Sequence, residues 1–344
     1  MTSTPDVGRQ RATSRGSVLE LRFTSSLGPA YLGRLLAEVG FDVQVLAHGA
    51  EVDTPNGGER DEQCEEYQNF TDRGKKFEPL ADEGPPFQLI IGSEPLPRAL
   101  LVHPRAQGAV QCLVRPGSDG APVRSSLTAY ARSGLMFCNG YPALPPRSVN
   151  GSHFEHLAAM MAFGACALAL SPGSASPRLI EVSAYELACS LDYSGIPMWQ
   201  YLGLERQQSG RNIGQNHPVS HYRCEDGFVF LNVVTQEQWQ RLCAVMGKME
   251  LLDDPRFSTP KIRRLHAEAL NAELDEWFLM QRADEVVERC QEVRVPCDRI
   301  KGLSEAVDDE QLRIREFWER IAGTGRSYPV ARSAFTPPIG SFRG

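Results

Sequence analysis

The chain has 344 residues, of which 42% are hydrophobic and 23% are charged, and its formal net charge is −7. These proportions are typical of a globular protein, and the length is sufficient for two domains. The acidic balance argues against non-specific binding of nucleic acid, and no apolar run approaches the roughly 18 residues that a membrane-spanning helix needs. We therefore expect neither a nucleic-acid partner nor a membrane partner.

The first seventeen residues are polar and carry three arginines, which predicts a flexible tail over residues 1–17 rather than a secretory signal. The nine cysteines include no CxxC pair and no Cys/His cluster. This pattern indicates neither a zinc site nor a disulfide framework, so we expect no metal. Reduced cysteines that serve mainly in packing favour a cytoplasmic location.

The chain opens with the pattern of a strand, a helix and a second, parallel strand. Residues 17–21 predict a strand, residues 30–40 have apolar side chains at helical spacing, and residues 41–46 predict the next strand. Gly28 and Pro29 lie in the turn before the helix, where backbone N–H groups can face a phosphate. The GxGxxG fingerprint is absent, so a dinucleotide site is disfavoured.

The later segments alternate between strand and helix patterns and then change in character. A polar stretch after residue 203 has the composition of a linker, and a hairpin around Asp226-Gly227 follows it. Two tryptophans, Trp199 and Trp239, have apolar neighbours on predicted helices, so we expect both in the core. Strands are predicted over 87–92 and 109–114, and helices over 156–170, 237–246 and 262–292.

Several stretches, in this order, resemble the family III CoA-transferases, which include formyl-CoA transferase, carnitine CoA-transferase and α-methylacyl-CoA racemase. The opening SVLELRFTSSLGPAYLGRLLAEVGFDVQVL is similar to the family's "VLDL…AGP…LLADLGADVIKVE". FTDRGKKFEPL is similar to "LNRGKRSVTLDL", and ARSGLM to "QAxSGLM". The longest match, NIGQNHPVSHYRCEDGFVFLNVVTQEQWQRLCAVMGKMELLDDPRFST, resembles "RxGNxHPxxAPYxxYxTxDGWxxIAxxNDxQWxxLCxxLGxxELxxDPRF".

This resemblance implies an α/β fold in which a large Rossmann-like domain with a parallel sheet is joined to a smaller α+β domain. We expect residues 18–195 and 306–344 in the large domain, a linker over 196–219, and the small domain over 220–305. The resemblance also implies an interlocked homodimer, with a heterodimer containing an active paralogue as the alternative. Its implied ligand is coenzyme A or an acyl-CoA thioester.

The family's catalytic aspartate has no counterpart in this chain. In the transferases, the aspartate of "GYDxxxQAxSGLM" attacks the acyl-CoA carbonyl and then carries CoA as a thioester. The aligned stretch RSSLTAYARSGLM places Ser126 there. A serine hydroxyl is not ionised at neutral pH and needs an adjacent base, and an acyl-serine ester has no acyl group of its own that CoA can occupy. Ordinary CoA transfer through Ser126 is therefore not expected.

The racemase residues are also replaced, because Ser125, His153 and Gln236 occupy the positions of its histidine, aspartate and glutamate. His153 and Glu155 nevertheless begin a predicted helix at the expected mouth of the site. An imidazole there can exchange protons near neutral pH. We therefore take Ser126, His153 and Glu155 as candidate catalytic residues, with a helix-capping segment as the alternative interpretation.

Coenzyme A recognition is predicted from the family's glycine–proline turn and basic segment. Gly28 and Pro29 match the turn, and positive charge that suits phosphate comes from Arg73, Lys75 and Lys76. Three functions remain open. The first is an enzyme that isomerises, dehydrates, cyclises or hydrolyses an acyl thioester on CoA or another carrier. The second is a non-catalytic binding protein or subunit, and the third is a transferase that uses a shifted carboxylate such as Glu155.

Overall fold

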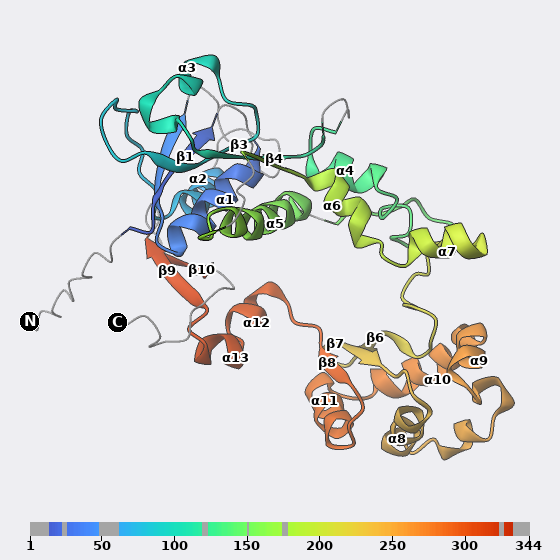
Figure 1. Ribbon diagram of the computed structural model, residues 1–344. Helices are drawn as coiled ribbons and strands as arrows, with labels where there is room; N and C mark the ends of the chain where they lie inside the picture. The colour runs from blue at the N-terminus through green and yellow to red at the C-terminus, as the bar shows by residue number, and fades with distance from the viewer. Residues whose placement is uncertain are drawn as a thin grey trace, which may run out of the picture. The chain divides into compact units, whose positions relative to one another are not determined.

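The computed structural model describes residues 14–22, 26–47, 62–118, 123–149, 151–173, 178–322 and 327–332. The chain divides into two compact units, both visible in Figure 1. The larger unit takes the described residues up to Phe137, those of 147–206 and those from Glu319 onward. The smaller unit takes residues 138–146 and 207–318.

A five-stranded parallel sheet forms the centre of the larger unit, with the strand order β2-β1-β3-β4-β5. The opening strand–helix–strand prediction is confirmed, because β1 and β2 pair in parallel and α1 connects them. The predicted α/β class with a parallel sheet is confirmed as well. The strands are β1 (Ser17–Arg22), β2 (Asp42–Ala47), β3 (Phe87–Gly92), β4 (Val110–Arg115) and β5 (Leu179–Ser183).

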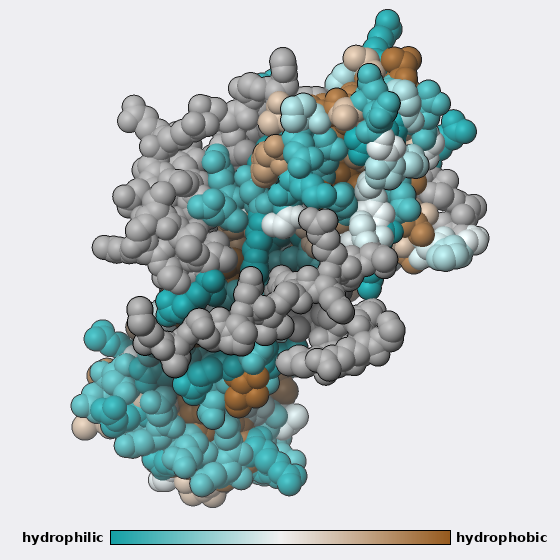
Figure 2. All heavy atoms as spheres, turned by 90° about the vertical axis from the view of Figure 1, so that its left-hand side faces the viewer, coloured by the Kyte–Doolittle hydropathy of each residue, from teal (hydrophilic) through white to brown (hydrophobic). Residues whose placement is uncertain are grey.

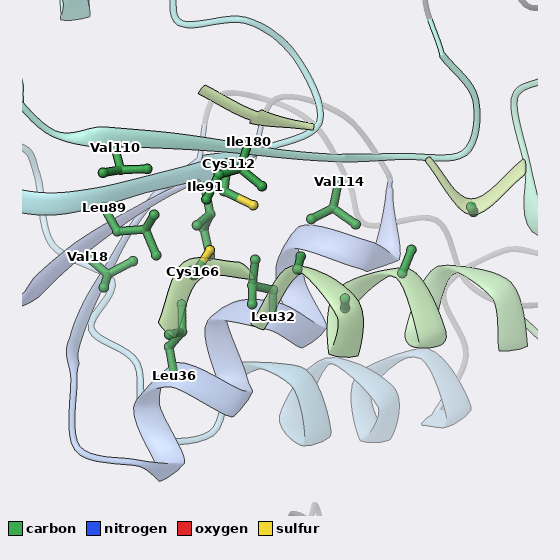
Figure 3. Close-up of a cluster of buried hydrophobic side chains, with 14 of the residues drawn as sticks. Val18, Leu32, Leu36, Leu89, Ile91, Val110, Cys112, Val114, Cys166 and Ile180 are labelled. Carbon is green, nitrogen blue, oxygen red and sulfur yellow. The ribbon is translucent and has the colours of Figure 1, made fainter. Parts of the chain in front are cut away.

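The main core lies between one face of this sheet and the helices α1 (Leu27–Glu38) and α5 (His153–Ala169). Figure 3 shows Val18, Leu89 and Ile91 reaching from the strands toward these helices, and Leu32 and Leu36 belong to α1. Side chains alternate along a strand, so the residues next to these in the strands, such as Leu19 and Ile90, face the other side of the sheet. That second cluster contains Leu19, Leu21, Phe87, Ile90, Leu100 and Ala106.

Helix α7 (Gly195–Leu202) of the larger unit carries Trp199, which was predicted to lie in the core. Trp199 on α7 is 62% exposed, so its predicted place in the core is wrong. The apolar neighbours of Trp199 in the sequence are exposed with it, which a pattern of hydrophobicity alone does not distinguish from burial. The remaining elements are α2 (Glu62–Asp72), α3 (Arg98–Leu101), η1 (Pro104–Ala106), α4 (Ser126–Arg132), α6 (Ala184–Leu191), β9 (Trp318–Ala322) and β10 (Ser327–Ala331).

The smaller unit packs helices against an antiparallel three-stranded sheet in the order β6-β7-β8. The predicted hairpin at Asp226-Gly227 is confirmed, and Trp239 is fully buried as predicted. The strands are β6 (Val219–Cys224), β7 (Gly227–Asn232) and β8 (Cys297–Arg299). The helices are α8 (Gln236–Met246), η2 (Met249–Leu252), η3 (Pro255–Phe257), α9 (Pro260–Leu265), α10 (Ala267–Leu279), α11 (Ala283–Glu292), α12 (Leu303–Val307) and α13 (Glu310–Ile314).

The two units divide the chain at different positions from those expected. Helix α7 occupies the start of the segment 196–219 that was expected to be a linker. Residues 306–318 belong with the smaller unit rather than with the larger one. An ion pair between Lys301 and Asp309 joins this segment to the residues that follow β8.

Candidate functional site

Three helices of the larger unit begin around one carboxylate, that of Glu155. Its Oε2 accepts a hydrogen bond from Leu27 N at 3.0 Å, and its Oε1 accepts one from Ser126 N at 3.2 Å. Leu27 and Ser126 are the first residues of α1 and α4, and Glu155 lies in the first turn of α5. A carboxylate is favourable there because the free N–H groups and the dipole of a helix concentrate positive charge at its N-terminus.

Ser126 belongs to the same junction, because its Oγ accepts a hydrogen bond from Phe154 N at 3.1 Å. Ser126 is 5% exposed and Glu155 is 7% exposed. Among the residues that the structure describes, no imidazole or carboxylate accepts the Ser126 hydroxyl proton. The local geometry therefore makes Ser126 a hydrogen-bond acceptor at a helix junction rather than an activated nucleophile.

His153 begins α5 but is exposed, and it lies beside the backbone of Gly151 rather than in the junction. Gly28 lies in the buried first turn of α1 with Pro29, and a Cβ there would be 3.7 Å from the carbonyl oxygen of Glu155. A Cβ at Gly28 would lie only 2.6 Å from Val114 Cγ1, so this glycine permits close packing of α1 on β4. The structure therefore brings Ser126, Glu155 and Gly28 together, and the junction lies where α1 follows β1 and α4 follows β4. This is the carboxyl end of the sheet, where ligands of parallel α/β sheets usually bind.

Lys75, a predicted phosphate ligand, is enclosed within the protein. Its Nζ donates to Glu20 Oε2 at 2.6 Å and to Ala30 O at 2.7 Å, and its side chain is 0% exposed. Glu20 also accepts from Arg22, which in turn contacts Asp72 at 2.6 Å. Burial lowers the pKa of Lys75, while the charge of Glu20 opposes that change. These contacts use the ammonium group to hold α1 and the segment after α2 onto β1.

The two other predicted phosphate ligands have different surroundings. Arg73 forms an ion pair with Glu319 of β9. Lys76 is 54% exposed and contacts Asp42 at 2.8 Å. Lys76 also lines a polar cavity of about 230 Å³ whose walls include Ser17, Asp42 and Phe87. These three residues begin β1, β2 and β3, so Lys76 lies at the amino end of the sheet, opposite the Ser126–Glu155 junction.

A tyrosine–histidine pair lies next to the junction and was not among the predicted site residues. Tyr67 Oη lies 3.0 Å from His156 Nε2, and His156 Nδ1 lies 2.8 Å from Ser152 O. Burial lowers the pKa of His156 and raises that of Tyr67. Because 89 residues separate the two side chains in sequence, no local spacing predicts their contact.

Within the described part of the chain, no three His, Cys, Asp or Glu side chains gather in a group that can hold a metal ion. The cysteines whose side chains the structure describes are free thiols. Over the same ranges, every helix is too short or too polar to cross a lipid bilayer.

A family model described as CoA-transferase family III matches residues 116–338, which is well over half of the chain. Succinyl-CoA–D-citramalate CoA-transferase of Chloroflexus aurantiacus is 29% identical over 189 residues, or 54% of this chain and 47% of that protein. Acetyl-CoA:oxalate CoA-transferase of Acetobacter aceti is 24% identical over 212 residues, or 60% of this chain and 54% of that protein. The matched part of the chain thus spans about half the length of these curated relatives.

Solved structures resemble the chain over almost its full length. A CAIB/BAIF family protein from Brucella suis has a TM-score of 0.79 and 17% identity, covering 95% of this chain and 92% of that one. A hypothetical protein from Mycobacterium tuberculosis has a TM-score of 0.71 and 18% identity, covering 94% of this chain and 91% of that one. At these identities the likeness concerns the fold alone.

Proposed function

The chain belongs to CoA-transferase family III, and from this premise we propose that it binds an acyl thioester and acts on it without carrying CoA on an enzyme carboxylate. The reaction class is isomerisation, dehydration, cyclisation or hydrolysis of the acyl group. Coenzyme A is the proposed carrier, since the curated relatives named above are CoA-transferases.

The hydrogen bonding of Glu155 is the observation that carries the proposal. A CoA-carrying carboxylate must be free to attack an acyl carbonyl and to form a thioester in turn. Both oxygens of Glu155 accept backbone N–H groups of helix termini, and the residue is almost fully buried. Formation of an anhydride or a thioester at Glu155 would remove its charge and disturb these contacts. This argues against a transferase in which Glu155 replaces the family aspartate.

His153 is the proposed acid–base residue of the redirected chemistry. It is the first residue of α5 and is exposed to solvent, so its imidazole can approach a ligand at the carboxyl end of the sheet. Arg73 remains the proposed phosphate contact, because its side chain is partly exposed. Lys76 is no longer favoured, because it lies at the amino end of the sheet beside Asp42. Lys75 is better explained as a structural residue, because its ammonium group is fully enclosed.

A non-catalytic binding function is the second candidate, and the junction itself favours it. Ser126 and Glu155 have the hydrogen bonding of helix caps, which requires no catalytic role. In this case the chain would bind CoA weakly or serve as a subunit beside an active paralogue. The two candidates differ in one measurable property, since only the first consumes an acyl thioester.

We further propose that the chain forms a homodimer. The larger unit leaves a cluster of large apolar side chains exposed on and around α7, namely Tyr193, Ile196, Trp199, Tyr201, Leu202 and Leu204. Exposed apolar clusters of this kind mark protein interfaces in soluble proteins. By contrast, Figure 2 shows a face on which the described residues are mostly hydrophilic. A second copy of the chain is the proposed partner of the α7 cluster.

The proposed chemistry is tested by incubating the purified protein with succinyl-CoA or acetyl-CoA and a carboxylic-acid acceptor. We expect no transfer of CoA to the acceptor and no enzyme-bound thioester after trapping with hydroxylamine or borohydride. Ser126→Asp is the complementary variant, since it restores a carboxylate at the family position. Efficient transfer by the unmodified protein, with the thioester mapped to Glu155, would show that the carboxylate has only moved.

A further inference from the structure

The Tyr67–His156 pair has a defined direction of hydrogen bonding. The Ser152 carbonyl oxygen can only accept a hydrogen bond, so the nearby His156 Nδ1 must carry the proton. In the neutral ring, Nε2 then carries a lone pair and accepts a hydrogen bond from the Tyr67 hydroxyl. The imidazole is thus held by a third group while its other nitrogen faces a hydroxyl. This is the order of groups that activates a hydroxyl in many acyl-transfer enzymes.

The pair lies next to the helix junction at the carboxyl end of the sheet. His156 follows Glu155 directly in α5, and the charge of Glu155 acts on the Tyr67 hydroxyl. Tyr31 of α1 packs its ring against His156 with centroids 4.7 Å apart. Tyr67 and His156 are both half-buried, so each is partly accessible to solvent. The pair is therefore held by side chains of three elements, α1, α2 and α5.

The surrounding charges determine which partner holds the proton. Burial lowers the pKa of His156, and the charges of His153 on α5 and Arg34 on α1 act in the same direction, while the bond to Ser152 opposes them. Burial raises the pKa of Tyr67, as do Glu155 on α5 and Tyr31 on α1, while Arg34 opposes them. At neutral pH the histidine is therefore a free base and the tyrosine keeps its proton. Such a tyrosine can pass a proton on but does not hold a negative charge.

We propose that Tyr67 and His156 form a proton relay that deprotonates an O–H nucleophile attacking the acyl thioester, an inference that rests on the proposed function. The nucleophile is water in hydrolysis or a hydroxyl of the acyl chain in cyclisation. As its oxygen forms a bond to the acyl carbon, its proton moves to Tyr67 Oη and the original Tyr67 proton moves to His156 Nε2. The proton on His156 then returns by the same path to the departing thiolate. The products are CoA with a free thiol and a carboxylic acid or lactone, so no oxidant is required.

The test measures release of free CoA thiol from acetyl-CoA and from hydroxyacyl-CoA thioesters. We expect Tyr67→Phe, which keeps the ring and removes only the hydroxyl, to lower the rate by about 10²-fold or more at unchanged affinity for the thioester. His156→Gln should have a similar effect. In the unmodified protein the rate should fall only at a pH below the ordinary titration range of a histidine, because burial lowers the pKa of His156 and its imidazole is protonated only there.

His266→Gln is the control, since it changes an exposed histidine of the smaller unit that has no proposed catalytic role. It should keep the acidic limb of the pH profile, whereas His156→Gln should remove that limb from any residual activity. If the pair is purely structural, Tyr67→Phe and His156→Gln should change the stability of the protein without altering the pH profile of the rate. If His156→Gln does not fold, the isosteric Tyr67→Phe decides the question by its rate alone.

Calorimetry with CoA and acetyl-CoA separates failure of the relay from failure of the proposed function. Undetectable binding of both ligands by the unmodified protein would refute the proposed function, and the relay with it. Binding without thiol release from any thioester would refute the relay and leave the binding function in place. Thiol release at an unchanged rate by Tyr67→Phe would refute the relay alone.

Discussion

Lys75 and Lys76 are adjacent residues of one type in opposite surroundings. The ammonium group of Lys75 is enclosed between Glu20 and the Ala30 carbonyl, whereas Lys76 is more than half exposed beside Asp42. Removing one partner of a buried ion pair leaves the other charge without compensation. An exposed ion pair contributes little because solvent screens it.

We therefore predict that Lys75→Met lowers the free energy of unfolding by about 3–5 kcal/mol, since it deprives Glu20 of one of its two cations. Lys76→Met is the control and should change stability by less than about 1 kcal/mol. Urea unfolding followed by circular dichroism measures both. Equal, small losses in the two variants would mean that the Lys75–Glu20 pair is not a structural contact.

His217 in the smaller unit links stability to pH. It is fully buried, and Arg263 donates from Nε to its carbonyl oxygen at 2.9 Å. Burial lowers the pKa of His217 to about 4, and the charges of Arg264 and Arg211 act in the same direction. The unfolded chain binds this proton below about pH 6.5, whereas the folded protein resists it until about pH 4. Stability due to His217 is therefore complete above pH 6.5 and is lost as the pH falls.

Between pH 7.5 and pH 5 this linkage should reduce the free energy of unfolding by about 2 kcal/mol, at 1.36 kcal/mol for each pKa unit. Urea unfolding at the two pH values should show that His217→Asn lacks this part of the pH dependence. His266→Asn, which changes an exposed histidine, is the control and should retain it. The linkage is refuted if the two variants respond to pH alike.

At the scale of the elements, the site is built by the close approach of helices to the sheet. Gly28 lies in the first turn of α1, and a Cβ there would meet Val114 of β4. Gly164 lies within α5, and a Cβ there would meet no atom within 4 Å. Both glycines are in helices, so intrinsic helix propensity favours alanine at each. Only the tertiary packing separates them.

We predict that Gly28→Ala destabilises the protein by about 1–3 kcal/mol, because the extra methyl group forces α1 away from β4. Gly164→Ala should instead stabilise it by about 0.5–1 kcal/mol, since a glycine inside a helix has more conformational entropy to lose. Thermal unfolding of the two variants gives opposite shifts of Tm. A stabilising Gly28→Ala would show that α1 does not pack on β4 as described.

At the scale of the whole molecule, several large apolar side chains on and around α7 are exposed. Trp199, Tyr201 and Leu202 contribute large apolar area that a monomer would leave in water. Burial of such area is worth roughly 25 cal/mol for each Å², so a second copy would gain from covering it. The proposed homodimer accounts for this exposure without any further partner.

Sedimentation at micromolar concentration should therefore give about twice the chain mass of 38.1 kDa. Trp199→Glu should shift the equilibrium toward the monomer, because it places a charge in the proposed interface. Met280→Glu changes another exposed apolar residue, at the end of α10 in the smaller unit, and should leave the mass unchanged. Sedimentation of the unmodified protein as a monomer would contradict the proposed homodimer.

The sequence alone determined the opening strand–helix–strand unit, the hairpin at Asp226-Gly227 and the membership of the family. These depend on local periodicity, turn residues and long matched motifs, all of which are readable along one chain.

Only the tertiary structure decided which of these side chains are buried and which are exposed. Lys75 and Lys76 are indistinguishable by composition, and Trp199 and Trp239 have similar apolar neighbours in sequence, yet each pair divides into a buried and an exposed member. The contact of Tyr67 with His156 likewise joins segments 89 residues apart. Burial and hydrogen bonding depend on which segments meet in space, and that information is absent from any local pattern of residues.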